Sequence, residues 1–250
     1  VDEGWKILDD FVDKNITVQE LYAKFQELCG DKMLIDKSPP YCMDMRTLHY
    51  AEEIFDKPKY ILLYRHPYSV MESMLKLRLD KLFSRSLFMR NDVDPWVVVE
   101  TVWNISNRNL LTFSNQIDKE RIHWVRFEDF VQNPEAIMQN ICAFLEIPYE
   151  DTILTPYDGK KERMISGLGD PNILLHNKID PKLADVWKNI KIPHSLDEST
   201  MAIAAQLGYE LPEVGEEQSI DDSILSSMNL SEDEVANTLD ELISENADEK

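Results

Sequence analysis

An arginine, a proline and a serine directly follow the most apolar short run of the chain. Residues 60–64 read YILLY, and Arg65, Pro67 and Ser73 come next. A guanidinium offers a planar fork of donors that can bind a phosphate through two hydrogen bonds. Ser73 lies eight residues after Arg65, about two helical turns, so its hydroxyl can face the same side. The spacing is compatible with a phosphate site; the alternative is that Arg65 pairs with a carboxylate and Ser73 is a neutral helix position.

Apolar runs that alternate with helical patterns indicate the elements that hold these residues. The apolar runs predict strands at 33–35, 60–64 and 122–126. The helical patterns fall at 16–29, 43–56, 68–83, 94–115, 127–148 (a turn and a helix), 181–189 and 196–207. Such alternation predicts an α/β fold with a parallel sheet covered by helices on both faces. Ligands of these sheets bind at the carboxyl ends of the strands, where helix N-termini attract anions.

The charge and composition limit the ligand classes. The 250-residue chain has a net charge of −21, so a general basic field for nucleic acid is excluded, and an anionic ligand needs a local pocket. No apolar run approaches the roughly 20 residues of a membrane span, so no membrane association is expected. Cys29, Cys42 and Cys142 show no metal or disulfide spacing, which favours a cytoplasmic protein without a metal site.

The acidity is concentrated at the C-terminal end, which divides the chain into two regions. Residues 216–250 contain twelve acidic side chains and one lysine, a net charge of −11. We therefore expect an α/β domain over 1–212 and an acidic tail with a short amphipathic helix over 213–250. Leu239 and Leu242 lie on one stripe of that helix. The tail is either a solvated end or a helix that docks on another protein.

The chain resembles the sulfotransferase family at Arg65, Pro67 and Ser73. Three further segments resemble the family too, and they follow in the same order as in the family. These enzymes use 3′-phosphoadenosine 5′-phosphosulfate (PAPS) as the sulfuryl donor. The segments are DKSPPY at 36–41, the strand–turn–helix at 125–150 and the late loop at 169–188. The likeness is to sulfotransferase domains of bacterial, especially cyanobacterial, polyketide synthases. It covers roughly residues 31–210 and implies a P-loop-NTPase-like sulfotransferase fold with a central parallel sheet flanked by helices.

The resemblance also implies roles for single residues. Arg65 and Ser73 correspond to ligands of the donor's 3′-phosphate. Lys37 corresponds to a lysine that stabilises the charge building on the bridging oxygen during in-line transfer. His176 and Lys178 lie where the family contacts the donor. The alternative for Lys37 is a lysine that is solvated or paired with Asp36. The alternative for His176 and Lys178 is a solvated loop without donor contacts.

The same resemblance suggests an acceptor and partners. The acceptor would be a hydroxyl, such as the β-hydroxyl of an acyl chain on an acyl carrier protein. That carrier protein or other polyketide synthase domains would then be partners, and PAPS would be the co-substrate without a metal.

Other conspicuous side chains have structural interpretations. Arg126 is expected to pair with Glu128 or Asp129. His49 and His66 are expected to be structural histidines. The large side chains of 94–113 are expected in the helix core, namely Trp96, Val99 and Trp103. The tyrosine usual at one position of the family pattern is Phe127 here, so a hydroxyl contact to the nucleotide would be lost.

One family feature has no counterpart in residues 1–30. Sulfotransferases begin with a strand and a P-loop-like turn whose N–H groups bind the 5′-phosphosulfate, and no such sequence precedes residue 30. We therefore expect an N-terminally truncated domain that lacks this loop and the probable general base, with exposed sheet edges and marginal stability. The alternative function is a non-catalytic remnant, or a nucleotide-binding or interaction module acting through its acidic tail.

Overall fold

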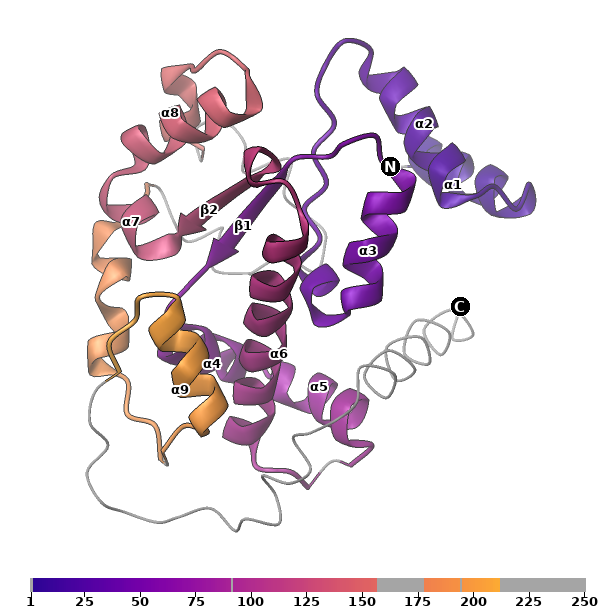
Figure 1. The fold of residues 1–250 in the computed structure, drawn as a ribbon. Helices are drawn as coiled ribbons and strands as arrows, with labels where there is room; N and C mark the ends of the chain where they lie inside the picture. The colour runs from indigo at the N-terminus through magenta and orange to yellow at the C-terminus, as the bar shows by residue number, and fades with distance from the viewer. Residues whose placement is uncertain (1, 91, 157–177, 194, 212–250) are drawn as a thin grey trace.

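The computed structural model of the chain describes residues 2–90, 92–156, 178–193 and 195–211 (Figure 1). The strands are β1 (Tyr60–Tyr64) and β2 (Ile122–Arg126). The helices are α1 (Asp2–Asp13), α2 (Val18–Cys29), α3 (Met45–Ile54), α4 (Pro67–Lys76), α5 (Leu79–Phe88), α6 (Pro95–Gln116), α7 (Phe127–Gln132), α8 (Pro134–Leu145) and α9 (Glu198–Gln206). Short 3₁₀ helices span Pro39–Met43, Lys119–Arg121, Asp151–Leu154, Pro181–Ala184 and Val186–Asn189.

The two strands pair in parallel and in register. Tyr60 lies opposite Ile122, and Tyr64 lies opposite Arg126. Both strands were predicted at these bounds, but the strand predicted at 33–35 is wrong. A run of three apolar residues forms a ladder only beside a partner strand, and in the described part of the chain β1 pairs with β2 alone. The side chain of Ile35 is accordingly 67% exposed.

One face of the sheet packs against α6 and α9. The rings of Tyr64 and Trp124 meet edge to face, with their centroids 5.6 Å apart. Both rings pack on a buried cluster that includes Trp103 of α6 and Ile203 of α9. The long helix α6 runs through the centre of the molecule in Figure 1, and its apolar side chains fill much of the core. Val99 and Trp103 are buried as predicted, and Trp96 packs at the edge of the core.

The opposite face of the sheet is covered unevenly. His123 of β2 stacks on Phe144 of α8, with ring centroids 5.2 Å apart. Ile61 and Leu63 of β1, which point to the same side, remain 39% and 57% exposed. The prediction of a sheet covered on both faces therefore holds for β2 and is wrong for β1.

Most predicted helices are present, with changes at their ends. α2 begins with a capping box, in which the Thr17 N–H donates to Glu20 at 2.7 Å and the Glu20 N–H donates to the Thr17 hydroxyl. The helix predicted at 68–83 is two helices, separated where Arg78 adopts a left-handed φ of 58°. A left-handed residue interrupts the helical hydrogen-bond ladder. The acidic tail lies outside the described residues.

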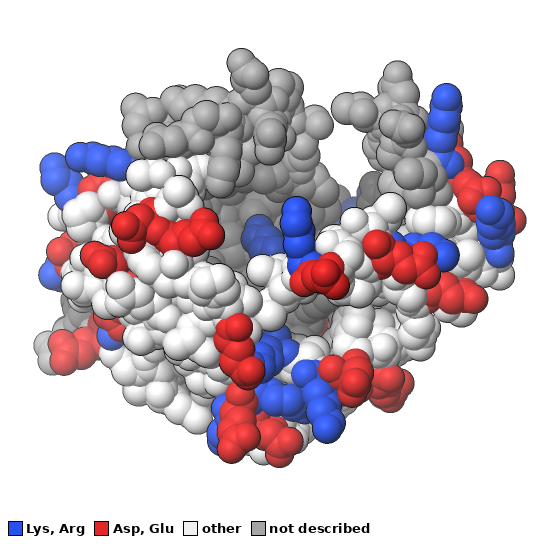
Figure 2. Space-filling view, turned by 90° about the horizontal axis from the view of Figure 1, so that it is seen from above, with Lys and Arg blue, Asp and Glu red and all other residues white. Residues whose placement is uncertain are grey.

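The described surface mixes both signs of charge. Figure 2 shows Lys and Arg side chains interspersed with Asp and Glu over the face seen from above, with no broad basic area among the coloured residues. No described helix combines the length and the apolarity needed to cross a membrane.

Candidate functional site

Both strands run into helices almost without a loop. Arg65 and His66 alone separate β1 from α4, and Phe127 begins α7 directly after β2. Because Tyr64 and Arg126 are paired, these two junctions lie side by side at the carboxyl end of the sheet. Arg65 therefore stands at the position predicted from the sequence. The N-terminus of α4, with the partial positive charge of its helix dipole, lies at the same edge.

His66 caps α4 from inside the core. Its Nδ1 accepts a hydrogen bond from the Tyr68 N–H at 3.2 Å, and Pro67 occupies the first turn, where an N–H is not needed. The imidazole is 1% exposed and stacks on Trp187, with ring centroids 4.2 Å apart. Since Nδ1 is an acceptor, the ring proton lies on Nε2, which faces the Glu210 carbonyl at 3.5 Å. The prediction of a structural histidine is confirmed.

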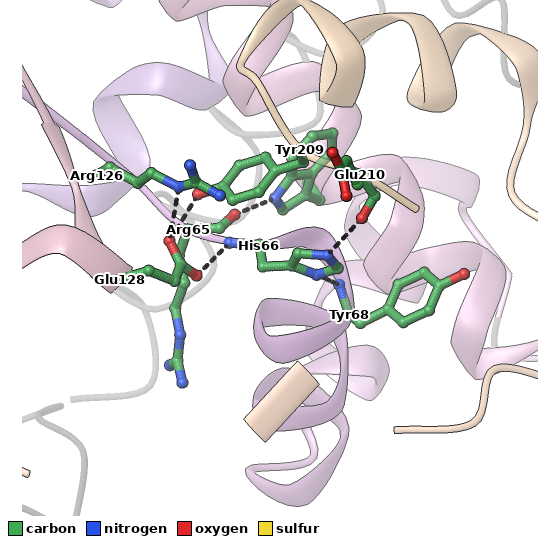
Figure 3. A network of polar contacts seen from close by, with 8 residues as sticks. Arg65, His66, Tyr68, Arg126, Glu128, Tyr209 and Glu210 are labelled. Atoms are coloured by element: carbon green, nitrogen blue, oxygen red, sulfur yellow. Dashed lines mark hydrogen bonds and ion pairs between the residues drawn. The ribbon is translucent and has the colours of Figure 1, made fainter. Parts of the chain in front are cut away.

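Glu128 joins three segments that are distant in sequence. One carboxylate oxygen accepts the His66 N–H at 2.9 Å, and the other accepts the Tyr209 hydroxyl at 2.9 Å. The second oxygen also lies 3.5 Å from Nε of Arg126, which confirms the predicted ion pair. Figure 3 shows the carboxylate between Arg126, Tyr209 and the backbone of His66. The buried glutamate thus ties the end of β1 to the start of α7 and to the segment after α9.

The Arg65 side chain is oriented by its neighbours from other elements. Its guanidinium lies over the ring of Phe127, with Cζ 4.2 Å from the ring centroid. Its carbonyl oxygen accepts a hydrogen bond from the indole N–H of Trp103 at 3.1 Å. In Figure 3 the side chain extends past Glu128, away from His66 and alongside α4. Ser73, the second predicted phosphate ligand, is half-buried in α4.

The loop that contains Lys37 is anchored by Asp36. This carboxylate accepts hydrogen bonds from the hydroxyls of Tyr22, Ser38 and Tyr41, at 2.6, 2.7 and 2.7 Å. Burial raises the pKa of Asp36, but the three hydroxyl donors outweigh it and hold the pKa below its usual value. Lys37 itself is exposed and makes no ion pair with any residue that the structure describes. The Asp36–Lys37 pair, one of the two alternatives for this lysine, is therefore not formed.

The late loop is only partly described. Lys178 is exposed, and His176 lies outside the described residues. The segment that follows reaches the site through Trp187, which stacks on His66.

His49 was predicted to be structural, and its Nε2 lies 2.7 Å from the side-chain oxygen of Gln116. Within the described ranges, no group of three His, Cys, Asp or Glu side chains could hold a metal ion.

Sequence reasoning missed the polar residues that hold the site together. Glu128 was considered only as a partner of Arg126, and Tyr209 was not considered. A signal for Glu128 was its position two residues after the last residue of a strand. Tyr209 follows Gly208, whose φ of +78° ends α9 and directs the chain back to the sheet.

Comparison with known proteins agrees with this arrangement. The sequence profile of the sulfotransferase family matches residues 5–151, more than half of the chain. The sulfotransferase domain from the curacin biosynthetic pathway superposes with a TM-score of 0.78 at 40% identity, covering 84% of this chain and 75% of that domain. The sulfotransferase domain from the Synechococcus PCC 7002 olefin synthase gives 0.75 at 36% identity, covering 84% and 71%.

Two curated relatives are more distant and longer. Nodulation protein NoeE of Sinorhizobium fredii (strain NBRC 101917 / NGR234) is 23% identical over 80% of this chain and 48% of its own length. Protein-tyrosine sulfotransferase A of Caenorhabditis elegans is 26% identical over 48% of this chain and 30% of its own length. The chain thus spans at most about half the length of these relatives. The profile match and the two structural neighbours show that the chain belongs to the sulfotransferase family.

Proposed function

We propose that this chain takes part in transfer of a sulfuryl group from PAPS to a hydroxyl. The observation that carries the proposal is the placement of Arg65 at the carboxyl end of β1, beside the N-terminus of α4 and over the ring of Phe127. A fixed guanidinium beside a helix N-terminus suits a phosphate. Family membership supports sulfotransfer as the reaction, and PAPS is the donor that the resemblance implies.

In this proposal each site residue has a separate role. Arg65 and Ser73 bind the 3′-phosphate of the donor nucleotide. Lys37 is exposed and free of Asp36, so its ammonium is available to the 5′-phosphosulfate. Charge that builds on the bridging oxygen during in-line transfer is stabilised by such a cation. His176 and Lys178 contribute donor contacts from the late loop.

We further propose that the acceptor is the β-hydroxyl of an acyl chain on an acyl carrier protein. The support is the similarity to sulfotransferase domains of the curacin pathway and of an olefin synthase, at 40% and 36% identity. The carrier protein would then be a partner of this chain. Incubation with PAPS and a 3-hydroxyacyl carrier protein tests this, because mass spectrometry detects the sulfated product; transfer to free sugars or tyrosyl peptides instead would contradict it.

The donor site is tested by calorimetric titration with 3′-phosphoadenosine 5′-phosphate. Arg65→Ala is expected to weaken binding by at least about tenfold, because a charge-assisted phosphate contact is lost. Arg108→Ala is the matched control, since Arg108 is an exposed arginine on α6 and its removal should leave the affinity unchanged. An unchanged affinity in Arg65→Ala would refute the phosphate role of this residue.

A further inference from the structure

We propose that Phe127 and Glu128 are positioning residues that together fix the orientation of Arg65. This inference rests on the proposed binding of a 3′-phosphate by Arg65. The two residues are adjacent in sequence and open α7, which begins where β2 ends. They act on different parts of the arginine: Phe127 on the guanidinium and Glu128 on the backbone that carries it.

Phe127 holds the charged end of the side chain. The Arg65 Cζ lies 4.2 Å from the centre of the Phe127 ring, well within cation–π distance. Stacking engages the face of the guanidinium and not its in-plane N–H groups, which are the donors of a two-pronged phosphate contact. The ring face makes this contact, so the absence of a tyrosine hydroxyl does not remove it.

Glu128 holds the other end of the same residue. Its carboxylate accepts the N–H of His66, the residue directly after Arg65, at 2.9 Å. The peptide between Arg65 and His66 is held on its other side by the Trp103 indole, which donates to the Arg65 carbonyl at 3.1 Å. The peptide plane from which the arginine departs is therefore fixed by one acceptor and one donor.

The carboxylate of Glu128 is itself held in place. Tyr209 donates its hydroxyl to the second oxygen at 2.9 Å, and Arg126 lies 3.5 Å from the same oxygen. Arg126 also stacks on the Tyr209 ring, with Cζ 4.4 Å from the centroid. Figure 3 shows Arg126 and Tyr209 next to the Glu128 carboxylate, and the Arg65 side chain running past Glu128 in the direction away from them. The network thus braces the backbone from which the Arg65 side chain departs.

The test compares two nucleotides that differ only in the 3′-phosphate. Calorimetry on the full 250-residue chain measures the affinities for 3′-phosphoadenosine 5′-phosphate and for adenosine 5′-phosphate, and their ratio is the 3′-phosphate preference. Phe127→Leu is expected to lower this ratio about threefold, whereas Phe127→Tyr keeps the aromatic face and the ratio. Glu128→Ala is expected to lower the ratio roughly fivefold, and Glu128→Gln to restore most of it, because the amide oxygen still accepts the His66 N–H.

A merely structural role would affect both nucleotides alike and would not depend on Arg65. In an Arg65→Ala background, Phe127→Leu is therefore expected to leave the ratio unchanged. The inference is overturned if the ratio falls in Arg65→Ala but not in Phe127→Leu and Glu128→Ala. It is also overturned if Phe127→Leu lowers the ratio equally with and without Arg65. A ratio that Arg65→Ala does not change refutes the proposed phosphate site instead. If Glu128→Ala fails to fold, the two Phe127 variants still test the inference. Tyr209→Phe, which removes only one donor to the Glu128 carboxylate, then replaces Glu128→Ala in the comparison.

Discussion

Protonation of His66 should destabilise the folded chain as the pH falls below about 6.5. Burial, with smaller contributions from the positive charges of Arg126 and Arg65, lowers the pKa of His66 from 6.5 to about 4, although the hydrogen bond to the Glu210 carbonyl partly opposes this shift. Between these two pH values the unfolded chain binds a proton at this histidine and the folded chain does not. The free energy of unfolding therefore decreases as the pH falls through this range, and the contribution becomes constant below the folded pKa.

The size of the effect follows from the same two pKa values. A depression from 6.5 to about 4 corresponds to about 3 kcal/mol of the free energy of unfolding at the acidic limit. The ring has little means of accommodating a proton. Its Nδ1 already accepts the Tyr68 N–H, so a protonated ring would lose this helix cap. Its faces and edges are enclosed by Trp187, Tyr68 and Tyr209. The nearby Glu128 carboxylate already accepts the His66 N–H and the Tyr209 hydroxyl.

Urea denaturation at a series of pH values measures this contribution. The matched variant is His66→Asn, because an asparagine oxygen can still accept the Tyr68 N–H at the helix cap but does not titrate. Its absolute stability should be lower, since the stacking on Trp187 is lost, but its stability should be nearly independent of pH between 6.5 and about 4.5. Below that value both proteins lose the contribution of carboxylates such as Glu52, whose pKa is lowered in the fold. Parallel pH profiles of the two proteins above pH 4.5 would refute the assignment of His66 as the titrating group.

Two further predictions concern the packing around the sheet. Phe113→Ala should lower the free energy of unfolding by about 3–5 kcal/mol, because Phe113 is 0% exposed and packs edge to face on Tyr60. Urea denaturation measures this loss, and the control variant Phe113→Leu should show a smaller one. Arg121→Met should cost about 2 kcal/mol at neutral pH, because Arg121 donates to both oxygens of Glu52 at 2.9 and 2.6 Å. The loss should diminish as the pH falls below 4.5 and Glu52 protonates, and a pH-independent loss would contradict this explanation.

Features encoded by short stretches of sequence were predictable. Residues 60–64 and 122–126 are apolar runs of strand length, and the structure has strands at both. The location of Arg65 followed from the same reasoning, because a residue that follows a parallel strand stands at its carboxyl end. The capping box of α2 depends on residues three apart and was equally visible.

Features that depend on distant residues were not predictable in this way. The bond from the His66 N–H to Glu128 joins residues 62 apart, and the bond from Tyr209 to Glu128 joins residues 81 apart. The pairing of β1 with β2 brings His66 to Glu128, and the packing of α9 on the sheet brings Tyr209. The same limitation explains the wrong strand at 33–35, because strand formation requires a partner that the run itself does not specify. The break at Arg78 lacked a signal, since no glycine or proline marks it.

Phe127 illustrates how a departure from a family pattern changes meaning once contacts are known. At the sequence level, the family resemblance implied that phenylalanine in place of tyrosine loses a hydroxyl contact to the nucleotide. In the structure the ring lies beneath the guanidinium of Arg65, a contact that phenylalanine and tyrosine make equally well. In the proposed site this position requires an aromatic face, and the adjacent Glu128 supplies the fixed backbone. An arginine restrained at both ends loses less conformational entropy when it binds a phosphate, so more of the interaction energy remains as affinity.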